Sequence, residues 1–158
     1  MKRKKMKIGN RSNDYKPNDQ YYTPEWIFEK LAIRFDLDVA SPEGGISWIP
    51  ADKYYDEQQD GLVSDWFGTV WMNPPFSKQR PWIEKFVEHR NGIALLPWSK
   101  SKSLGLIWDQ ADAICVLPSN LRFQHKDDGL KGIFVSVGLF AFGHKSIEAL
   151  KRLDHRVR

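Results

Sequence analysis

The chain has 158 residues, about the length of one domain, and its 41% hydrophobic and 28% charged residues are typical of a water-soluble globular protein. No apolar run approaches the roughly 18 residues of a membrane span, and no apolar stretch follows the basic amino terminus, so we expect neither a membrane span nor a secretory signal. The single cysteine, Cys115, excludes a disulfide within the chain, and its apolar neighbours predict a buried position on a strand.

The net charge of +4 is distributed unevenly along the chain. Residues 1–16 hold seven basic residues against one acidic residue, a net of +6, and residues 151–158 hold four against one, a net of +3. Subtracting both from the total leaves −5 for the residues between them. Basic tails commonly bind nucleic-acid phosphates, although a solvated tail without a partner has the same composition. We expect residues 1–19 to form a flexible basic arm and residues 20–158 to form one domain.

The hydrophobic pattern predicts helices that alternate with strands. The first helix is expected to start at Thr23 as N-cap, with Pro24 at its first position. The expected helices cover residues 23–34, 81–88, 102–110 and 144–153, and the expected strands cover 35–40, 46–49, 69–72, 92–96 and 113–117. Residues 50–65 are expected to be irregular, and 130–142 to be a hairpin or one long strand interrupted at Gly138. This alternation favours an α/β fold with a largely parallel sheet and flanking helices.

The most informative motif is Asn73-Pro74-Pro75-Phe76, which directly follows an apolar strand. Two consecutive prolines fix φ twice and remove two backbone donors, so the peptide is stiff. The Asn73 side-chain oxygen and a proline carbonyl can accept both hydrogens of an exocyclic amino group, and the Phe76 ring can stack on a flat heterocycle. The alternative is a proline-rich turn that merely ends the strand.

Further polar residues stand where a ligand would bind in an open α/β sheet, at the carboxyl ends of its strands. Asp38 ends the first expected strand, and Thr23 offers a hydroxyl at a helix start. Asp60 and Asp65 precede the strand that leads into Asn73-Pro74-Pro75-Phe76. A carboxylate there can accept a hydrogen bond from the adenine amino group of a nucleoside cofactor. Each also has an ordinary structural interpretation, as a turn carboxylate, an N-cap or part of a surface turn.

Other chemistries find no support in the sequence. The four histidines are scattered, and no Cys/His spacing fits zinc, so no metal site is predicted. The chain contains no phosphate loop of the Walker type, no G-x-G-x-x-G and no G-x-S-x-G.

From about Tyr21 to Gly143, the chain resembles the phage-type DNA N-6-adenine methyltransferase (Dam-like) family in the order and spacing of several short segments. The glycine-rich turn usual in methyltransferases is reduced here to residues 40–45, and we expect no separate target-recognition domain in a chain of this length. The pieces that carry the resemblance are residues 22–26 (YTPEW), 35–41 (FDLDVAS), 54–55 (YY), 60–62 (DGL), 65–66 (DW), 70–77 (VWMNPPFS), 95–97 (LLP), 121–123 (LRF) and the apolar segment 132–142.

The resemblance implies a compact Rossmann-like methyltransferase fold that uses S-adenosylmethionine to methylate adenine in DNA, in a phage or prophage protein acting in the bacterial cytoplasm. The catalytic motif would be Asn73, Pro74, Pro75 and Phe76. The cofactor would be bound by Tyr22, Thr23, Pro24, Asp38, Val39, Ala40, Asp60, Asp65 and Asn73. DNA contacts would come from the basic residues Lys78, Arg80, Lys100, Lys102, Arg122 and Lys126, and from the tails.

The implied reaction needs no covalent protein intermediate. Adenine's amino nitrogen becomes more nucleophilic when hydrogen-bond acceptors bind both of its hydrogens. Alignment of this nitrogen with an activated methyl group provides much of the remaining rate enhancement. The target base would have to leave the duplex. Two alternatives stay open: a degenerate methyltransferase fold that binds DNA or cofactor without transfer, and a methyltransferase that acts on RNA or protein.

Overall fold

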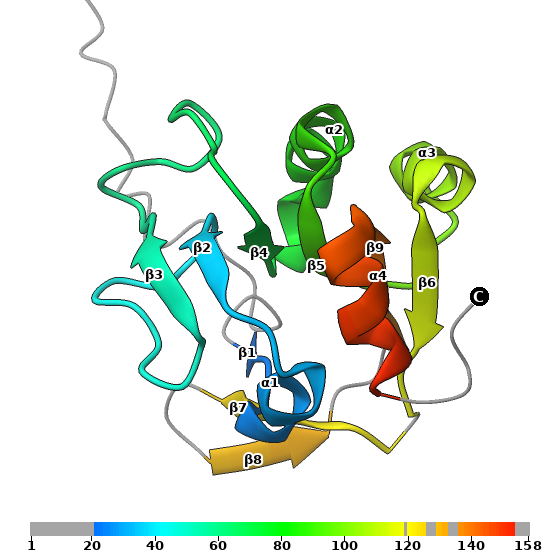
Figure 1. The fold of residues 1–158 in the computed structure, drawn as a ribbon. Helices are drawn as coiled ribbons and strands as arrows, with labels where there is room; N and C mark the ends of the chain where they lie inside the picture. Colours follow the sequence, from blue (N-terminus) through cyan, green and yellow to red (C-terminus); the bar gives the residue numbers. More distant parts are fainter. Residues whose placement is uncertain (1–20, 119, 126–128, 133–135, 154–158) are drawn as a thin grey trace, which may run out of the picture.

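The computed structural model describes residues 21–118, 120–125, 129–132 and 136–153. Its centre is a six-stranded sheet in the order β3-β2-β4-β5-β9-β6 (Figure 1). Strands β2, β3, β4 and β5 are parallel, while β9 runs antiparallel to both of its neighbours. The strands are β2 (Phe35–Asp38), β3 (Ala51–Tyr54), β4 (Val70–Met72), β5 (Gly92–Pro97), β6 (Ala113–Val116) and β9 (Val137–Phe142).

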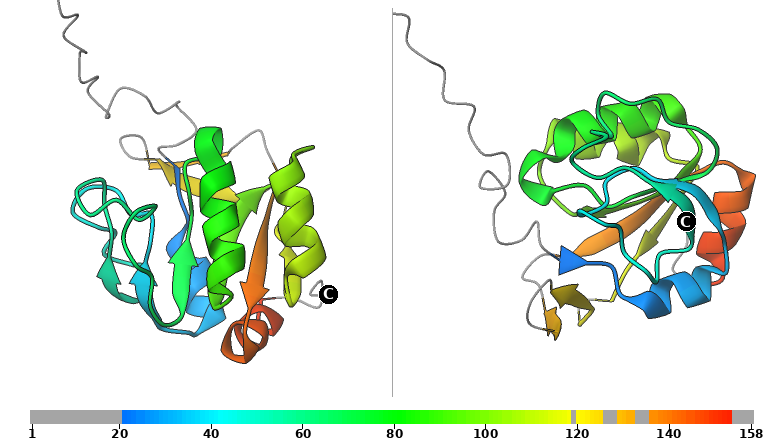
Figure 2. Two further views of the ribbon diagram at one scale, coloured as in Figure 1. Left: turned by 90° about the horizontal axis from the view of Figure 1, so that it is seen from above. Right: turned by 90° about the vertical axis from the view of Figure 1, so that its left-hand side faces the viewer.

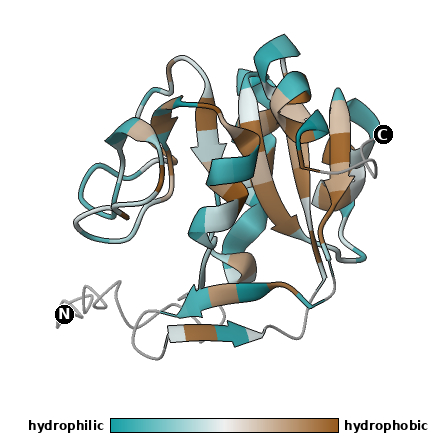
Figure 3. Ribbon diagram, turned by 60° about the horizontal axis from the view of Figure 1, so that its bottom comes forward, coloured by the Kyte–Doolittle hydropathy of each residue, from teal (hydrophilic) through white to brown (hydrophobic). Residues whose placement is uncertain are grey.

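Helices cover both faces of this sheet, as the right-hand view of Figure 2 shows. Side chains alternate between the faces along each strand, so Trp71 packs with α1 and α4 whereas Val70 and Met72 pack with α2 and α3. Apolar residues therefore concentrate in the central strands (Figure 3). The helices are α1 (Glu25–Leu31), α2 (Gln79–His89), α3 (Lys102–Gln110) and α4 (His144–Lys151). The structure confirms the predicted α/β class, with a mixed, largely parallel sheet and flanking helices.

A second, antiparallel sheet of three short strands lies beside the first. The chain between β6 and β9 forms β7 (Arg122–His125) and β8 (Gly129–Gly132), and β1 (Tyr21–Tyr22) pairs with β7. Tyr21 pairs with His125 and Tyr22 with Gln124, so the start of the described chain is held against a segment about a hundred residues later.

Several predicted boundaries were wrong. Thr23 does not cap α1, because Pro24 occupies the N-cap position and Thr23 is buried. Residues 46–49 form turns, and the strand lies instead at β3, inside the segment expected to be irregular. β3 has a polar sequence because it is an edge strand, with three of its four residues exposed.

The prediction for residues 130–142 was also wrong. β8 pairs with β7, a strand that was not predicted, and β9 belongs to the central sheet. Gly138 does not interrupt β9; it lies within it, where a Cβ atom would stand 2.6 Å from the ring of Trp98. The glycine is therefore needed for close approach of an indole ring.

Among the described residues, no helix is long and apolar enough to cross a membrane. Residues 1–20 lie outside the described part of the chain, and so does the predicted basic arm.

Candidate active site

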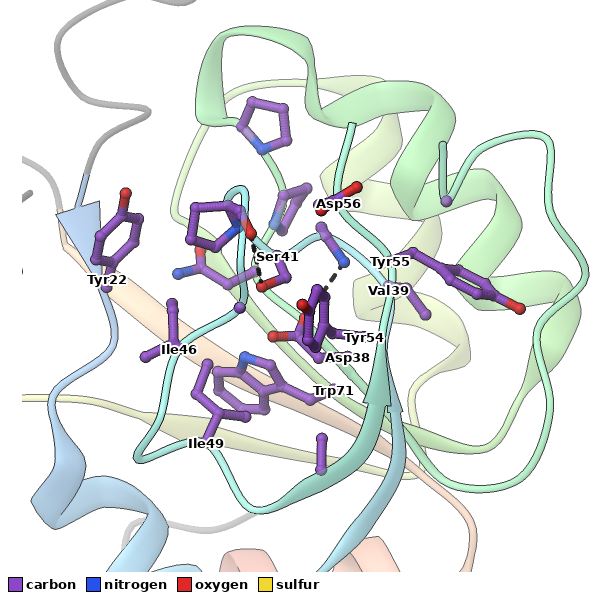
Figure 4. A pocket seen from close by; sticks show the side chains of 18 of the residues that line it. Tyr22, Asp38, Val39, Ser41, Ile46, Ile49, Tyr54, Tyr55, Asp56 and Trp71 are labelled. Carbon is purple, nitrogen blue, oxygen red and sulfur yellow. Dashed lines mark hydrogen bonds between the residues drawn. The ribbon is translucent and has the colours of Figure 1, made fainter. Parts of the chain in front are cut away.

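A cavity of about 1260 Å³ opens at the carboxyl ends of β2 and β4 (Figure 4). From β2 the chain passes to β3 on one side, and β4 lies on the other side, so the two strand ends form a topological switch point of the sheet. Residues that follow β2 and β4 line the cavity together with Tyr22 of β1 and His125 of β7. Residues from both sheets and from the ends of two neighbouring strands therefore line one cavity.

Asn73 follows β4 directly and is oriented by a buried partner. Its Nδ2 donates a hydrogen bond to Thr23 Oγ1 at 3.3 Å, and the Thr23 carbonyl accepts one from Trp48 Nε1 at 2.9 Å. Thr23 is completely buried. Because the amide nitrogen faces Thr23, the Oδ1 atom is the acceptor that Asn73 can offer to a ligand.

The two prolines differ in how their carbonyls are used. The Pro75 carbonyl accepts the Lys78 amide at 3.0 Å, which closes the short 3-10 turn Phe76–Lys78. Pro74 lines the cavity, and Phe76 lines it at the start of that turn. The Pro74 carbonyl is therefore the better candidate for the second acceptor beside Asn73.

Asp38 ends β2 at the cavity and is only 3% exposed. Burial raises the pKa of its carboxyl to about 7, opposed by a hydrogen bond from the Ala40 amide to Oδ1 at 3.2 Å. Asp38 pairs with Trp71 across β2 and β4, and both are among the side chains that line the cavity (Figure 4). The Trp71 indole N–H is buried with no hydrogen-bond partner among the described residues.

The cavity is strongly acidic. Among the residues that the structure describes, its lining includes six acidic side chains but one lysine, Lys78. Such a lining attracts cationic ligands and disfavours phosphate inside the cavity. The acidic side chains are those of Asp38, Glu43, Asp52, Asp56, Glu57 and Asp60.

The structure brings most of the predicted site residues to this cavity. Thr23 lies behind Asn73, Pro24 lies beside Arg122 in a separate cavity of about 280 Å³, and Asp65 is outside the lining, where its carbonyl accepts a hydrogen bond from Tyr55 Oη at 2.8 Å. The predicted residues that line the cavity are Tyr22, Asp38, Val39, Ala40, Asp60, Asn73, Pro74, Pro75, Phe76 and Lys78.

The predicted DNA contacts come from several elements around the same edge of the sheet. Lys78 and Arg80 stand where α2 starts after β4, and Lys100 and Lys102 where α3 starts after β5, so all four lie at the carboxyl edge. The Arg80 side chain forms an ion pair with Glu84 at 2.9 Å. Arg122 is exposed on β7, and Lys126 lies outside the described residues.

Sequence reasoning missed part of the lining. Trp48 lines the cavity from a segment without a motif of its own, and Tyr54 and Tyr55, which belong to the family resemblance, line it too although neither was predicted as a site residue. The unusual number of tryptophans, seven, was the available signal, since tryptophan often lines ligand pockets. Among the described residues, no group of three or more His, Cys, Asp or Glu side chains could hold a metal ion.

Comparison with known proteins identifies the family. The model of the family described as DNA N-6-adenine-methyltransferase (Dam) matches residues 11–128. The DNA N-6-adenine-methyltransferase of Haemophilus phage HP1 (strain HP1c1) is 31% identical to this chain over an alignment of 87 residues, and the match covers 49% of each protein. The match thus spans about half the length of that curated relative, and no solved structure matches the chain. Because the family match covers most of the chain and contains both strand ends of the cavity, the protein belongs to the DNA N-6-adenine-methyltransferase (Dam) family.

Proposed function

We propose that this protein transfers a methyl group from S-adenosylmethionine to the exocyclic amino group of adenine in DNA. One observation carries the proposal: in a chain of this family, Asn73–Phe76 and the buried Asp38 line the same cavity from neighbouring parallel strands. We further propose that the fold is a Rossmann-like methyltransferase fold, since its cavity lies at the topological switch point where such folds bind nucleosides.

The cavity fits the cofactor in charge and in size. S-adenosylmethionine carries a sulfonium and an ammonium group, which suit a lining rich in carboxylates. At about 1260 Å³, the cavity is larger than the roughly 300–1000 Å³ of an ordinary small-molecule pocket, so a cofactor and a base fit together. We assign Asp38, Val39, Ala40 and Asp60 to the cofactor, with Tyr22 and Asn73 at its boundary with the base. When bound, the cofactor supplies an activated methyl group.

The chain's own residues orient the base. Asn73 Oδ1 and the Pro74 carbonyl accept the two amino hydrogens, which localises the nitrogen lone pair, and Phe76 stacks on the ring. The hydrogen bond from Asn73 to Thr23 holds the amide so that its oxygen stays available. No side-chain nucleophile takes part, because transfer to the amino nitrogen is direct.

DNA phosphates would bind outside the acidic cavity. Lys78, Arg80, Lys100 and Lys102 surround its edge from the starts of α2 and α3, and Arg122 adds a positive charge on β7. Lys126 and the basic tails would add phosphate contacts that position a duplex without reading its sequence. The target adenine would flip into the cavity, and the reaction would take place in the cytoplasm of a bacterial host.

The test is incubation of the protein with unmethylated DNA and labelled S-adenosylmethionine, followed by nucleoside analysis. We expect N6-methyladenine from the wild type and none from Asn73→Ala, whose circular dichroism should match the wild type because the residue stands at a strand end. Label in RNA or protein but not in DNA would favour the alternative substrates. Cofactor binding without any transfer would favour a catalytically degenerate protein.

A further inference from the structure

One face of α2 is occupied by residues 60–68 rather than by solvent. Trp82, Lys85 and His89 share this face because they are three and seven positions apart along the helix. Trp82 stacks on Trp66, with ring centroids 6.5 Å apart and an angle of 23° between the planes. His89 Nε2 lies 2.8 Å from the Gly68 carbonyl oxygen. The helix therefore contacts this segment along two turns.

Lys85 makes the central contact. Its ammonium donates hydrogen bonds to the carbonyls of Gly61 at 2.9 Å, Leu62 at 3.1 Å and Ser64 at 2.5 Å. An ammonium has three donors, and here all three bind one short segment, residues 60–66, which we call the 60–66 loop. Nζ also lies 5.1 Å from the centroid of the Trp66 ring, within the range of a cation–π contact.

The environment of Lys85 reduces the hydration of its charge. Desolvation lowers the pKa of the ammonium, and the nearby carboxylates of Asp65, Asp60 and Glu88 offset only part of this shift. A lysine on a helix surface usually extends into water. Here the side chain gives up part of its hydration to bind three backbone carbonyls, which indicates a specific structural role.

The 60–66 loop is a wall of the candidate active site. Asp60, Gly61 and Leu62 line the cavity, and a Cβ atom on Gly61 would lie 2.0 Å from the Val39 carbonyl oxygen. The loop thus packs tightly against the end of β2, with the Trp66 indole donating to the Gly61 carbonyl at 2.7 Å. It holds its position without belonging to a helix or a strand.

Helix α2, which carries Lys85, also follows the Asn73–Phe76 motif. The 3-10 turn Phe76–Lys78 connects the two. We propose that Lys85 is a positioning residue. By binding the 60–66 loop to α2, it fixes the position of this loop, which forms the part of the cavity wall assigned to the cofactor, relative to the Asn73–Phe76 motif. The identity of the ligand rests on the proposed function, whereas the loop contact itself does not. A preformed wall increases ligand affinity because less order has to be created on binding.

The test compares Lys85→Met with Lys151→Met, a matched change of a lysine that forms an exposed ion pair with Glu148 on α4. Hydrogen–deuterium exchange should be faster at residues 60–66 in Lys85→Met and unchanged in Lys151→Met. The Kd for S-adenosylmethionine, measured by calorimetry, should rise about tenfold or more, because a loop released from α2 has to be ordered again when the cofactor binds. At saturating cofactor, kcat should stay within about threefold of the wild type, because the Asn73–Phe76 motif is untouched.

Wild-type exchange in the loop together with a wild-type Kd would overturn the proposal. A wild-type protein that does not bind S-adenosylmethionine would instead overturn the proposed function, and the exchange measurement would still test the loop contact. If Lys85→Met does not fold, Lys85→Arg replaces it in the same measurements. A planar guanidinium cannot direct its donors as a compact ammonium does, so faster loop exchange is expected there too, and unchanged exchange contradicts the proposal.

Discussion

Asn73 and Thr23, 50 residues apart in the sequence, are joined by a hydrogen bond from the Asn73 amide nitrogen to the Thr23 hydroxyl at 3.3 Å. Thr23 lies between β1 and α1 and is completely buried, so its hydroxyl is held in place. The Asn73 side chain would lose this hydrogen bond if it rotated. The candidate catalytic amide is therefore oriented by a residue that the sequence pattern assigns to a helix cap.

The first prediction concerns this orientation. Thr23→Val keeps the volume of the side chain but removes the acceptor, so the Asn73 amide can rotate. We expect kcat to fall about tenfold, which corresponds to the roughly 1–1.5 kcal/mol of one hydrogen bond, with a small change in the KM for cofactor. The control is Thr69→Val, a buried threonine directly before β4 and outside the cavity lining. Equal kcat values for the two variants would show that Thr23 does not orient Asn73.

The second prediction is a dependence of stability on pH. Burial raises the pKa of Asp38 from 3.8 to about 7, so between these values the folded state keeps a proton that the unfolded state releases. The free energy of unfolding therefore falls as the pH rises through this window, by up to roughly 4 kcal/mol. Below the window both states are protonated, and the effect is absent.

Asp38→Asn removes the ionisable group and should remove this part of the pH dependence. The measurement is urea denaturation of both proteins at about pH 5 and about pH 8. The variant should gain stability relative to the wild type at the higher pH. Parallel pH profiles for the two proteins would mean that the Asp38 carboxyl has an ordinary pKa.

The third prediction uses two glycines in opposite surroundings. A Cβ atom on Gly61 would lie 2.0 Å from the Val39 carbonyl oxygen and 2.9 Å from the Trp82 ring, whereas one on Gly105 would meet nothing within 4 Å. We expect Gly61→Ala to lower the free energy of unfolding by about 1–3 kcal/mol through overpacking. Gly105→Ala, inside α3, should raise it by about 0.5–1 kcal/mol through higher helix propensity. Denaturation midpoints that shift in the same direction would contradict the close contact between the 60–66 loop and β2.

The fourth prediction concerns the basic amino-terminal residues, which lie outside the described part of the chain. Residues 1–16 carry a net charge of +6, and the cavity lining is acidic. Deleting them should weaken DNA binding and flatten its salt dependence by about one unit of slope for each phosphate that the arm neutralises. Cofactor affinity and the methylated sequence should not change. A truncated protein with the full salt slope would place the DNA contacts on the edge formed by α2 and α3.

The sequence by itself predicted the features that depend on neighbouring residues. The alternation of apolar segments indicated an α/β fold, and helix 102–110 was predicted with the bounds of α3, because Ser101 caps it locally through the Leu104 amide. The strand end at Asn73-Pro74-Pro75-Phe76 was evident because proline restricts the backbone wherever it occurs. Family membership followed from the order and spacing of such local pieces.

Tertiary structure decided the features that depend on residues far apart in the chain. Local sequence does not predict which strands pair with each other. The polar edge strand β3 pairs with β2, and β8 pairs with β7 rather than with β9. Thr23 became a buried partner of Asn73 instead of a helix cap, and the pKa of Asp38 rose because the surrounding strands exclude water from it. Lys85 looks like any helix-surface lysine in the sequence, and its role depends on three carbonyls more than 20 residues away. Burial and strand pairing are properties of the assembled chain, which is why the contacts that shape this site are determined only when the sheet is complete.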